Sequence, residues 1–571
     1  MDLIDSLNDK VIGITLSSQN IDLFNIVEQV KEQVHTHEEG VEEVYQYLKG
    51  LLDADSLSKK LNQEGLSTAQ KIKMVVDEKA TRLQNKDEFL RFIQENAMQI
   101  RANWSSRESL EEIFAGEVDS SYIDTILDIK NYFVHQPHGI LTFLVDEDGQ
   151  TIDPESEKIE IDKEKTYQKV EALYDYVVGN IENGEHRFNR LTLDGQGKFG
   201  PVAGLIRTED EKNAEPQDYD LEQLIQGYEF AKKHGMDVRI NALVFFKDFP
   251  DRLINADEET CKIALENYGK AVASVANKYN DGVLTTLDMF NEFVTYKEPF
   301  KEQDDKWLSK LSIEKLCEIA SKIKAEMPEN VEFGYNDWNF ENSEKRKVIF
   351  RVLRRIQDYE KDNNCKIIDY IGTQCHTTIN DIEGFRASIE ELQEFGLPIY
   401  ITELDISKGI EGIDYERLTP SQLTVVKKYE QHLQNKMMQF IRDFVEEGKI
   451  AGVTAWSASD EVCPVFCDGK QASVIGMSYD REKGFTFSGK EIEPIEMTEE
   501  EMQIITNLTK YRHFKDKDTA KCYLTEQQIG MLIANQSVIA KNNAQKQYMN
   551  DEKDLENTKE EINKGVNLDG E

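Results

Sequence analysis

From about residue 165 onward, the chain alternates helical segments with short and nearly continuous apolar runs. There are seven such runs: FNRLTL from 188, VRINALVFF from 238, VLTTLDMF from 283, VEFGYN from 331, IDYIGTQ from 368, PIYITEL from 398 and GVTAWS from 452. Strands that are buried on both faces have this composition, and helices such as LEQLIQGYEFAKKHG would cover a parallel sheet. The pattern therefore predicts an α/β fold, a (β/α)8 TIM barrel with an N-terminal helical region and a polar C-terminal tail.

One strand of the expected eight is not identified by this pattern. Either KVIGITL near the N-terminus or ILTFLV from residue 140 would supply it, and the sequence leaves both open. If the first is correct, the helical segment that follows is an insertion in the barrel and not a preceding domain.

Four regions follow from periodicity and composition. Residues 1–135 are mostly helical, because IDLFNIVEQV and VEEVYQYLKGLL repeat apolar residues every three or four positions. Residues 136–164 form a linker or a hairpin with DEDG at its turn, and residues 165–510 form the barrel. Residues 511–571 are a polar helix and an acidic tail that we expect to be disordered.

The composition excludes several classes of partner. A formal net charge of -41 repels polyanions, so nucleic acid and acidic membrane surfaces are poor partners, whereas a neutral sugar is compatible. The first residues lack a basic segment followed by an apolar one, and no run of about 18 apolar residues occurs, so a cytoplasmic protein is expected. The pair Cys463 and Cys467 has no second pair beside it. We therefore expect no metal and no cofactor.

Two carboxylates stand where strands are expected to end. Glu292 follows the apolar run in TLDMFNEFV, and Glu403 follows the run in PIYITELDIS. In a barrel both would point into the same mouth, and two facing carboxylates are the groups that glycoside hydrolysis uses. Carboxylates at strand ends also cap following helices, so the pair alone does not establish the reaction.

The motifs around these carboxylates resemble the family 10 glycoside hydrolases, the endo-β-1,4-xylanases, over about residues 165–500. LDMFNEFV is similar to the acid/base motif of that family and PIYITELDIS to its nucleophile strand. Four other segments resemble family motifs in the same order along the chain: FNRLTLDGQGKF with the strand-two Lys, VEFGYNDWNFEN of strand five, IDYIGTQCHTTI with the strand-six Gln and His, and GVTAWSASDE with the strand-eight Trp.

The resemblance implies a retaining glycoside hydrolase that cleaves β-1,4-xylosidic bonds in xylan or xylo-oligosaccharides by double displacement. Glu292 would be the general acid/base and Glu403 the nucleophile, with their carboxyls about 5–5.5 Å apart. The negative charge of Glu403 would then keep Glu292 protonated near neutral pH.

The resemblance also implies supporting residues. Asn291 would bind the sugar 2-OH, and Trp456 would be the platform under the sugar. Gln374 and His376, two apart on one strand, would reach the nucleophile, with Asp405 orienting the imidazole. For Asn291, His376 and Trp456 the alternative is ordinary packing or hydrogen bonding in the core. The remaining expected contacts are Lys198 and Asp194 on the glycone side, and Tyr335 and Trp338, which would either line the aglycone side or pack beneath the loop.

Departures from the family pattern affect the expected specificity. Phe245 and Phe246 replace a Trp-His pair, Arg252 replaces a Trp, and Asp194-Gly195 replaces a Glu-Asn pair. Binding of the second glycone sugar should therefore be weaker. Two alternatives stay open: a non-catalytic barrel that binds glycans, or a protein partner through its helical N-terminal region, and a β-glucan-directed glycosidase with the same mechanism.

Overall fold

The computed structural model describes residues 11–510 with gaps at 62–65, 67, 81–82, 84, 96–118, 127–139, 153–159, 179–187, 201–211, 246–247, 251–252, 280–282, 284, 305, 408–409, 411–412, 414, 416–417, 457–476, 481–483 and 488–494. The predicted acidic tail lies outside this range. Among the described helices, none has the length and apolar character needed to cross a membrane.

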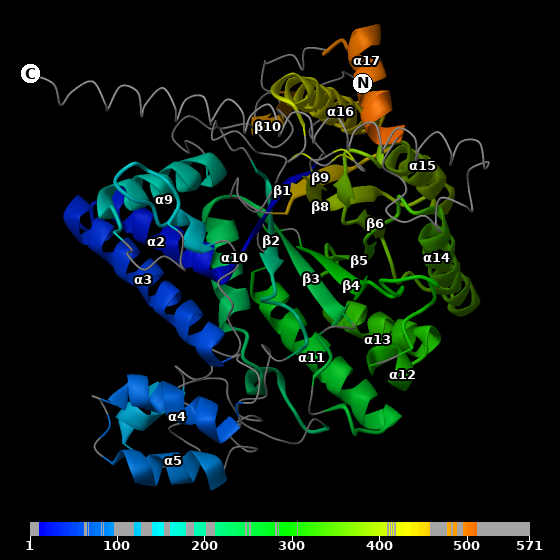
Figure 1. Ribbon diagram of the computed structural model, residues 1–571. Coiled ribbons are helices and arrows are strands. Elements are labelled where there is room, and N and C mark those ends of the chain that lie inside the picture. Colours follow the sequence, from blue (N-terminus) through cyan, green and yellow to red (C-terminus); the bar gives the residue numbers. More distant parts are fainter. Residues whose placement is uncertain are drawn as a thin grey trace, which may run out of the picture. The chain divides into compact units, whose positions relative to one another are not determined.

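Eight parallel strands close into a barrel (Figure 1). Each strand pairs with its neighbours in the order β6-β5-β4-β3-β2-β1-β9-β8, and pairing of β6 with β8 closes the ring. The predicted TIM barrel is thereby confirmed. Its strands are β1 (Val11–Leu16), β2 (Arg190–Asp194), β3 (Asp237–Phe245), β4 (Thr285–Asn291), β5 (Glu332–Asp337), β6 (Tyr370–Thr373), β8 (Ile399–Ser407) and β9 (Gly452–Ala455).

Of the two segments that could supply the eighth strand, KVIGITL is the one that does so. It forms β1, which pairs with β2 on one side and β9 on the other. The alternative segment instead begins with a short 3-10 helix, η2 (Ile140–Phe143), and the expected hairpin after it is a single antiparallel bridge between Val145 and Thr151. The helices from residue 18 to residue 178 therefore lie between the first two barrel strands in the chain.

Apolar strands and capped helices explain the barrel locally. Every residue of β4 is buried, as are all residues of β3 after Asp237, which fits strands enclosed by helices. The Asp257 side chain accepts a hydrogen bond from the amide of Thr260 and so caps α11 (Glu258–Lys278). The other helices of this part are η4 (Pro216–Asp218), α10 (Glu222–Lys233), α12 (Lys306–Lys310), α13 (Ile313–Glu326), α14 (Ser343–Asn363), α15 (Ile382–Leu392) and η6 (Gln393–Phe395).

The insertion between β1 and β2 builds from a helical hairpin. Its helices α2 (Ser18–Lys31) and α3 (His37–Leu61) run antiparallel, with the Tyr47 hydroxyl donating to Asp22 Oδ2 at 3.0 Å. Because α2 starts directly after β1 and α3 is 11 residues longer, the end of α3 extends on the side where the barrel strands end. A third helix, α9 (Lys163–Val178), joins this hairpin through the Tyr174 hydroxyl, which donates to Glu28.

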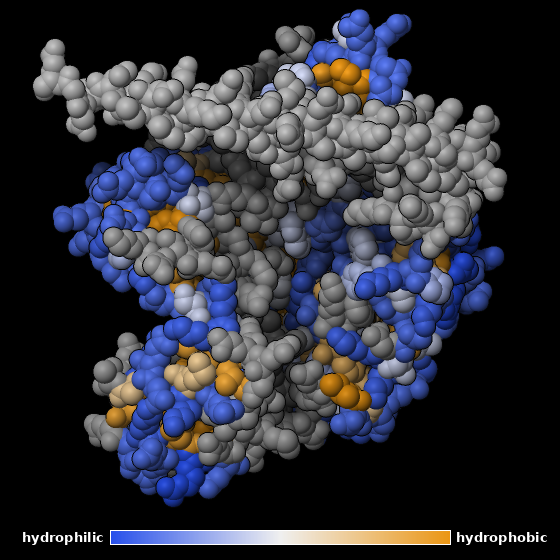
Figure 2. Space-filling model, in the orientation of Figure 1, coloured by the Kyte–Doolittle hydropathy of each residue, from blue (hydrophilic) through white to orange (hydrophobic). Residues whose placement is uncertain are grey.

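The far end of α3 carries a second hydrophobic core. It joins α4 (Thr68–Glu78), α5 (Lys86–Glu95) and a helical turn near residue 122. Figure 2 shows a mostly hydrophilic described surface, with a hydrophobic area over α4 and α5 at the lower left. The buried residues of this core are Leu57, Leu61, Val75, Val76, Phe89, Leu90, Ile93, Tyr122, Ile123 and Ile126.

The chain divides into two compact units, and the barrel with its insertion belongs to the larger one. The smaller unit comprises residues 409–434 and 494–571. It contains the first part of α16 (Pro420–Glu446) and α17 (Glu499–Lys510), which are joined by an ion pair of 2.8 Å between Lys428 and Glu501. The remaining strands, β7 (His376–Thr378), β10 (Met477–Asp480) and β11 (Gly484–Phe487), belong to the larger unit, where β10 pairs antiparallel with β11.

A buried carboxyl supports the loop between β5 and α14. Glu341 is 9% exposed, and its Oε1 has no hydrogen-bond partner among the described residues. Burial raises the pKa of Glu341 from 4.5 to about 7, with a further rise from the nearby charge of Asp381. The protein must therefore keep this carboxyl protonated to bury it at low cost.

We predict that Glu341 makes the protein less stable as the pH rises. The unfolded chain releases this proton near pH 4.5 and the folded chain only near pH 7, so stability from this group is complete below pH 4.5 and is lost through pH 7. The free energy of unfolding of Glu341→Gln, taken relative to that of the wild type, should therefore increase by on the order of 2 kcal/mol from pH 5 to pH 8. Urea unfolding at both pH values measures this, with exposed Glu344→Gln as control. An equal difference at both pH values would contradict it.

Candidate active site

Glu292 directly follows β4 in an unusual backbone conformation. Its φ is +58°, in the left-handed region that residues other than glycine rarely adopt and that is enriched at functional sites. The backbone amide of Glu292 donates to the carbonyl of Asn336 at 2.9 Å, which fixes the turn against the end of β5. The side chain is largely buried, with 7% of the residue exposed. The expected position at the end of a strand is therefore observed.

Glu403 is positioned differently from what the sequence predicted. It does not end its strand, because β8 continues to Ser407. The pairing of β8 with β9 shifts register between Ile401 and Leu404, and such an irregularity re-aims a side chain. Similar shifts occur in the neighbouring pairings, between Asn241 and Val244 and between Asp288 and Phe290. Bulges, and not only strand ends, therefore direct polar groups into the mouth, meaning the C-terminal end of the barrel.

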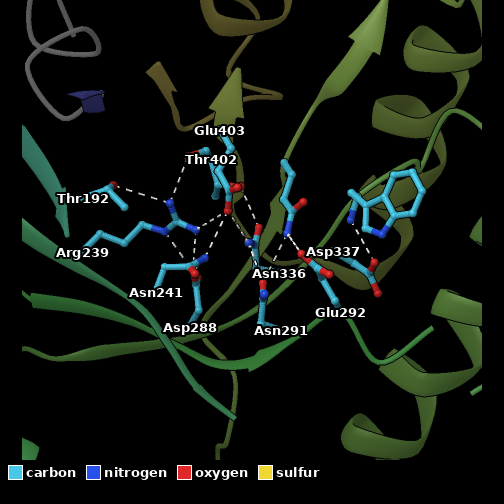
Figure 3. A network of polar contacts seen from close by, with 12 residues as sticks. Thr192, Arg239, Asn241, Asp288, Asn291, Glu292, Asn336, Asp337, Thr402 and Glu403 are labelled. Carbon is cyan, nitrogen blue, oxygen red and sulfur yellow. Dashed lines mark hydrogen bonds and ion pairs between the residues drawn. The ribbon is translucent and has the colours of Figure 1, made fainter. Parts of the chain in front are cut away.

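Amide side chains connect the two carboxylates (Figure 3). Gln374 Nε2 donates to Glu292 Oε1 at 2.8 Å and to Asn291 Oδ1 at 3.4 Å. Asn336 Nδ2 donates to Asn291 Oδ1 at 2.9 Å and to Glu403 Oε1 at 3.0 Å. Both contacts of Asn291 use its oxygen, so neither occupies its NH2 group. The five side chains form one continuous network from the ends of β4 and β5, from β8 and from the turn between β6 and β7.

Positive charge gathers around Glu403. Arg239 Nη2 lies 3.6 Å from Oε1, Asn241 Nδ2 donates to the same oxygen at 3.1 Å, and His376 Nε2 lies 3.2 Å from Oε2. Burial by itself raises the pKa of Glu403. The hydrogen bond from His376 and the charges of Arg239, His376 and Lys198 outweigh it, so the pKa of Glu403 is lowered. Glu403 is thus stabilised as an anion although it is almost fully buried.

Arg239 is itself held by a second carboxylate. Its Nη2 pairs with Asp288 Oδ2, and its Nη1 donates to the carbonyl of Thr402 at 2.9 Å. Tyr370 donates its hydroxyl to Asp288 Oδ1 at 2.7 Å. Burial opposes the charge of Arg239, but Asp288 and Glu403 outweigh burial and raise the pKa of Arg239. The guanidinium therefore stays charged between the two carboxylates.

A glycine lets one of the amides reach the network. A Cβ atom added to Gly372 on β6 would lie 2.5 Å from Oδ1 of Asn336 and 2.7 Å from Cγ2 of Thr402. Asn336 also accepts a hydrogen bond of 2.6 Å from the Thr402 hydroxyl. The missing side chain at Gly372 therefore leaves the space in which Asn336 lies beside Glu403.

Several members of the network were not predicted from the sequence, although the sequence carries a signal for them. Arg239 and Asn241 are polar, two positions apart and inside the apolar run VRINALVFF, so they share one face of a buried strand. Asp288 in VLTTLDMF carries the same signal. A buried strand with charged side chains on one face indicates that they have partners inside the barrel. The residues found only from the structure are Arg239, Asn241, Asp288, Asn336, Tyr370 and Thr402.

Gln374 and His376 were both expected to reach Glu403, but only His376 lies against it, whereas Gln374 donates to Glu292 instead. The expected reason, a shared strand, is also wrong. The two residues do not share a strand, because Gln374 and Cys375 lie between β6 and β7, and Cys375 has φ +59°. That turn, and not strand alternation, sends Gln374 to one carboxylate and His376 to the other. The rings of His376 and Trp456 meet in a T-shaped arrangement, with centroids 5.1 Å apart and planes at 89°. Asp405 pairs with His376 in the backbone register.

Tyr335 on β5 and Trp338, which directly follows β5, differ in their surroundings. Tyr335 is fully buried and donates its hydroxyl to Asp337 Oδ2 at 2.7 Å, which is a packing role. Trp338 is half-buried, and Lys345 Nζ lies 4.0 Å from its ring centroid. The ring of Tyr296 stacks on Trp338 with centroids 5.3 Å apart. Of the two, Trp338 is thus the residue whose ring borders the mouth.

The side chain of Lys198, which was expected to contact the glycone, is 19% exposed, and its Nζ lies 3.8 Å from Asp248 and 5.3 Å from the centroid of the Phe245 ring. The side chains of Asp194 and Asp405 lie outside the described part, as do Phe246, Arg252, Cys463 and Cys467. Within the described part, no three His, Cys, Asp or Glu residues are grouped to hold a metal ion.

Two buried carboxylates joined by amides at the mouth of a parallel (β/α)8 barrel define a barrel hydrolase of the glycosidase type. Residues 166–465, just over half of the chain, match the family model described as Glycosyl hydrolase family 10. The chain belongs to glycosyl hydrolase family 10 and is an endo-β-1,4-xylanase-like glycoside hydrolase. The resemblance seen in the motifs is thereby confirmed.

Curated relatives are identical to this chain at about a quarter of the aligned positions. Endo-1,4-beta-xylanase A of Caldicellulosiruptor saccharolyticus is 27% identical over 321 residues, which cover 53% of this chain and 86% of the relative. Endo-1,4-beta-xylanase A of Thermotoga maritima is 27% identical over 364 residues, which cover 59% of this chain but only 32% of the relative. A solved structure, the endo-1,4-beta-xylanase from Caldicellulosiruptor owensensis, aligns with a TM-score of 0.41 at 25% identity and covers 53% of this chain and 86% of that one.

We predict that breaking the buried pair of Arg239 and Asp288 is more costly than removing it. Arg239→Met should cost about 3–5 kcal/mol of unfolding free energy, because it leaves a buried charge uncompensated. Arg239→Met with Asp288→Leu should recover part of that loss. Urea unfolding measures both, and Lys347→Met, which breaks an exposed pair with Glu344, should change stability by less than about 1 kcal/mol. A double variant no more stable than the single one would contradict the coupling.

Proposed function

We propose that this protein cleaves β-1,4-xylosidic bonds in xylan or xylo-oligosaccharides with retention of configuration, by double displacement. The observation that carries the proposal is the amide network that joins Glu292 to Glu403 through Asn291, Asn336 and Gln374. Such a network fixes the relative position of the two carboxylates, and fixed geometry is what acid and nucleophile need for attack on one anomeric carbon.

The surroundings of the two carboxylates support different roles. Glu403 faces Arg239 and His376, so it is kept anionic and suits the nucleophile. Glu292 has neutral partners, the amide of Gln374 and the hydroxyl of Tyr296, so its ionised form is less strongly favoured than that of Glu403, as an acid that carries a proton to the leaving oxygen requires. We infer that Glu292 is the general acid/base and that the charge on Glu403 favours its protonated form.

The neighbouring side chains fit sugar binding. We infer that the Asn291 NH2 group binds the 2-OH of the sugar at the cleavage site and that Trp456 packs against the face of that sugar. Lys198 and Asp194 would contact the glycone, and Trp338 the aglycone. Asp405 would orient His376. A xylo-oligosaccharide is the class of substrate that the names of the relatives support, and no cofactor is part of this scheme.

The helical segment between β1 and β2 is proposed as an accessory unit inserted into the barrel, and β1 together with the chain from β2 to β9 is proposed as the catalytic part. Its own hydrophobic core around Val75, Val76 and Ile126 supports this division. A role as a surface for a protein partner is a further hypothesis for this unit.

Glu403→Ala should lower hydrolysis of an aryl β-xylobioside by at least about a thousandfold, because the covalent intermediate cannot form. Sodium azide should then restore turnover and give a product of inverted anomeric configuration, whereas the wild type retains it. NMR of the first product measures the configuration. Inversion by the wild type together with absence of azide rescue would remove the nucleophile assignment.

Two comparisons separate this proposal from its alternatives. Glu292→Gln should slow the hydrolysis of natural oligosaccharides far more than that of activated aryl glycosides, because only poor leaving groups need protonation by the acid. Cello-oligosaccharides cleaved in preference to xylo-oligosaccharides would indicate a β-glucan-directed enzyme. Calorimetric binding without any product over long incubation would indicate a non-catalytic barrel.

His376→Phe should move the acidic limb of the pH profile upward. His376 makes the largest favourable contribution to the low pKa of Glu403, so its removal raises that pKa. An ionised nucleophile is needed, and activity is lost as the pH falls through its pKa, so the loss should begin at a higher pH. The pH dependence of kcat/KM on the aryl glycoside measures it, with the exposed His37→Phe as control. An unmoved limb would contradict this role.

A further inference from the structure

The loop that follows the acid is held at both ends. Residues 293–303 fold back on themselves, with Val294 and Glu302 forming an antiparallel bridge. Gln303 Nε2 donates to the carbonyl of Val294 at 3.1 Å, and Arg355 Nη1 donates to Glu302 Oε2 at 2.6 Å. The loop therefore carries its side chains from a fixed base, and Tyr296 lies on it four residues after Glu292.

Tyr296 makes two contacts that belong together. Its ring stacks on the indole of Trp338, with centroids 5.3 Å apart and planes inclined by 27°. Its hydroxyl contacts Oε2 of Glu292. A sugar on the aglycone side would make the same two contacts, because its ring face would pack on an aromatic plane and its glycosidic oxygen would meet the acid.

The indole of Trp338 is covered by the ring of Tyr296. Its Nε1 atom is buried and has no hydrogen-bond partner among the described residues. A buried donor without a partner is costly, and sugar hydroxyls are suitable acceptors. Moving the Tyr296 ring away would uncover the indole on which it stacks.

We propose that Tyr296 occupies the aglycone position in the free enzyme and that a productive substrate must displace its side chain. This inference rests on the proposed function, because it assigns Glu292 as the acid. Tyr296 then sets specificity: aglycone sugars compete with an internal group of similar shape, whereas leaving groups that need no aglycone site do not. The anchored loop makes the displacement a rotation of one side chain and not an opening of the loop.

The competition predicts a direction for each variant. Tyr296→Ala removes the competitor, so KM for xylotetraose should fall about tenfold, since a ring stack and a hydrogen bond no longer have to be broken. Tyr296→Phe keeps the ring and loses the hydroxyl, so its KM should fall by a smaller factor, about threefold.

The test compares xylotetraose with β-xylobiosyl fluoride, whose leaving group is one atom and needs no aglycone site. Steady-state kinetics on the full chain would give kcat/KM for both, for the wild type, Tyr296→Ala, Tyr296→Phe and Tyr429→Ala. Tyr429 is a matched control, because it is also half-buried and stacked, on His432. Thermal unfolding of each variant checks folding, and Tyr296→Phe keeps the test available if the alanine variant is unstable.

A rise of the xylotetraose-to-fluoride ratio in the order wild type, Phe, Ala supports the proposal. A fall of that ratio, or a higher KM for xylotetraose in the alanine variant, would overturn it and make Tyr296 a part of the sugar-binding wall. An equal change toward both substrates would also overturn it, since it would indicate a general effect on Glu292. Failure of the proposed function can be distinguished from failure of this inference, because the wild type would then turn over neither xylotetraose nor the fluoride.

Discussion

The buried guanidinium of Arg239 is the charge on which the site depends. It lies between Asp288 and Glu403, and both of these carboxylates are removed from water. Without it, two anions inside the barrel would pay the full cost of desolvation and would repel each other. Together with His376, which makes the larger contribution, it keeps Glu403 ionised in a place where burial alone would favour the neutral acid. Tyr370 and the carbonyl of Thr402 complete the shell around the pair.

Neutral amides extend this charged centre toward Glu292. Asn336 contacts Glu403, and Gln374 contacts Glu292, with Asn291 between them. Amides can hold a carboxylate in place without adding net charge, so they fix both groups while leaving their protonation states free to differ. The barrel thereby supplies one cationic and one neutral environment within a single network, which is the asymmetry that an acid and a nucleophile require.

The insertion and the active-site loops make different use of the same scaffold. The helices after β1 build a separate core around residues such as Val76 and Ile123, so they add mass without altering the strand order. The loop after Glu292 instead brings Tyr296 against the Glu292 carboxyl and against Trp338. Small loops at strand ends therefore determine what reaches the carboxylates, whereas the barrel determines where the carboxylates are.

The sequence by itself determined the barrel and the identity of its two carboxylates, because apolar runs that alternate with amphipathic helices have few other solutions and because Glu292 ends one of those runs. It also pointed to Gln374, His376 and Asn291. Only the tertiary structure decided that KVIGITL is the first strand, since either candidate run satisfied the local pattern. It alone brought Arg239, Asn241 and Asn336 to Glu403, because these contacts depend on register shifts and on the space beside Gly372. Contacts between distant strands carry no local signal in a single chain, and for that reason periodicity could not predict them.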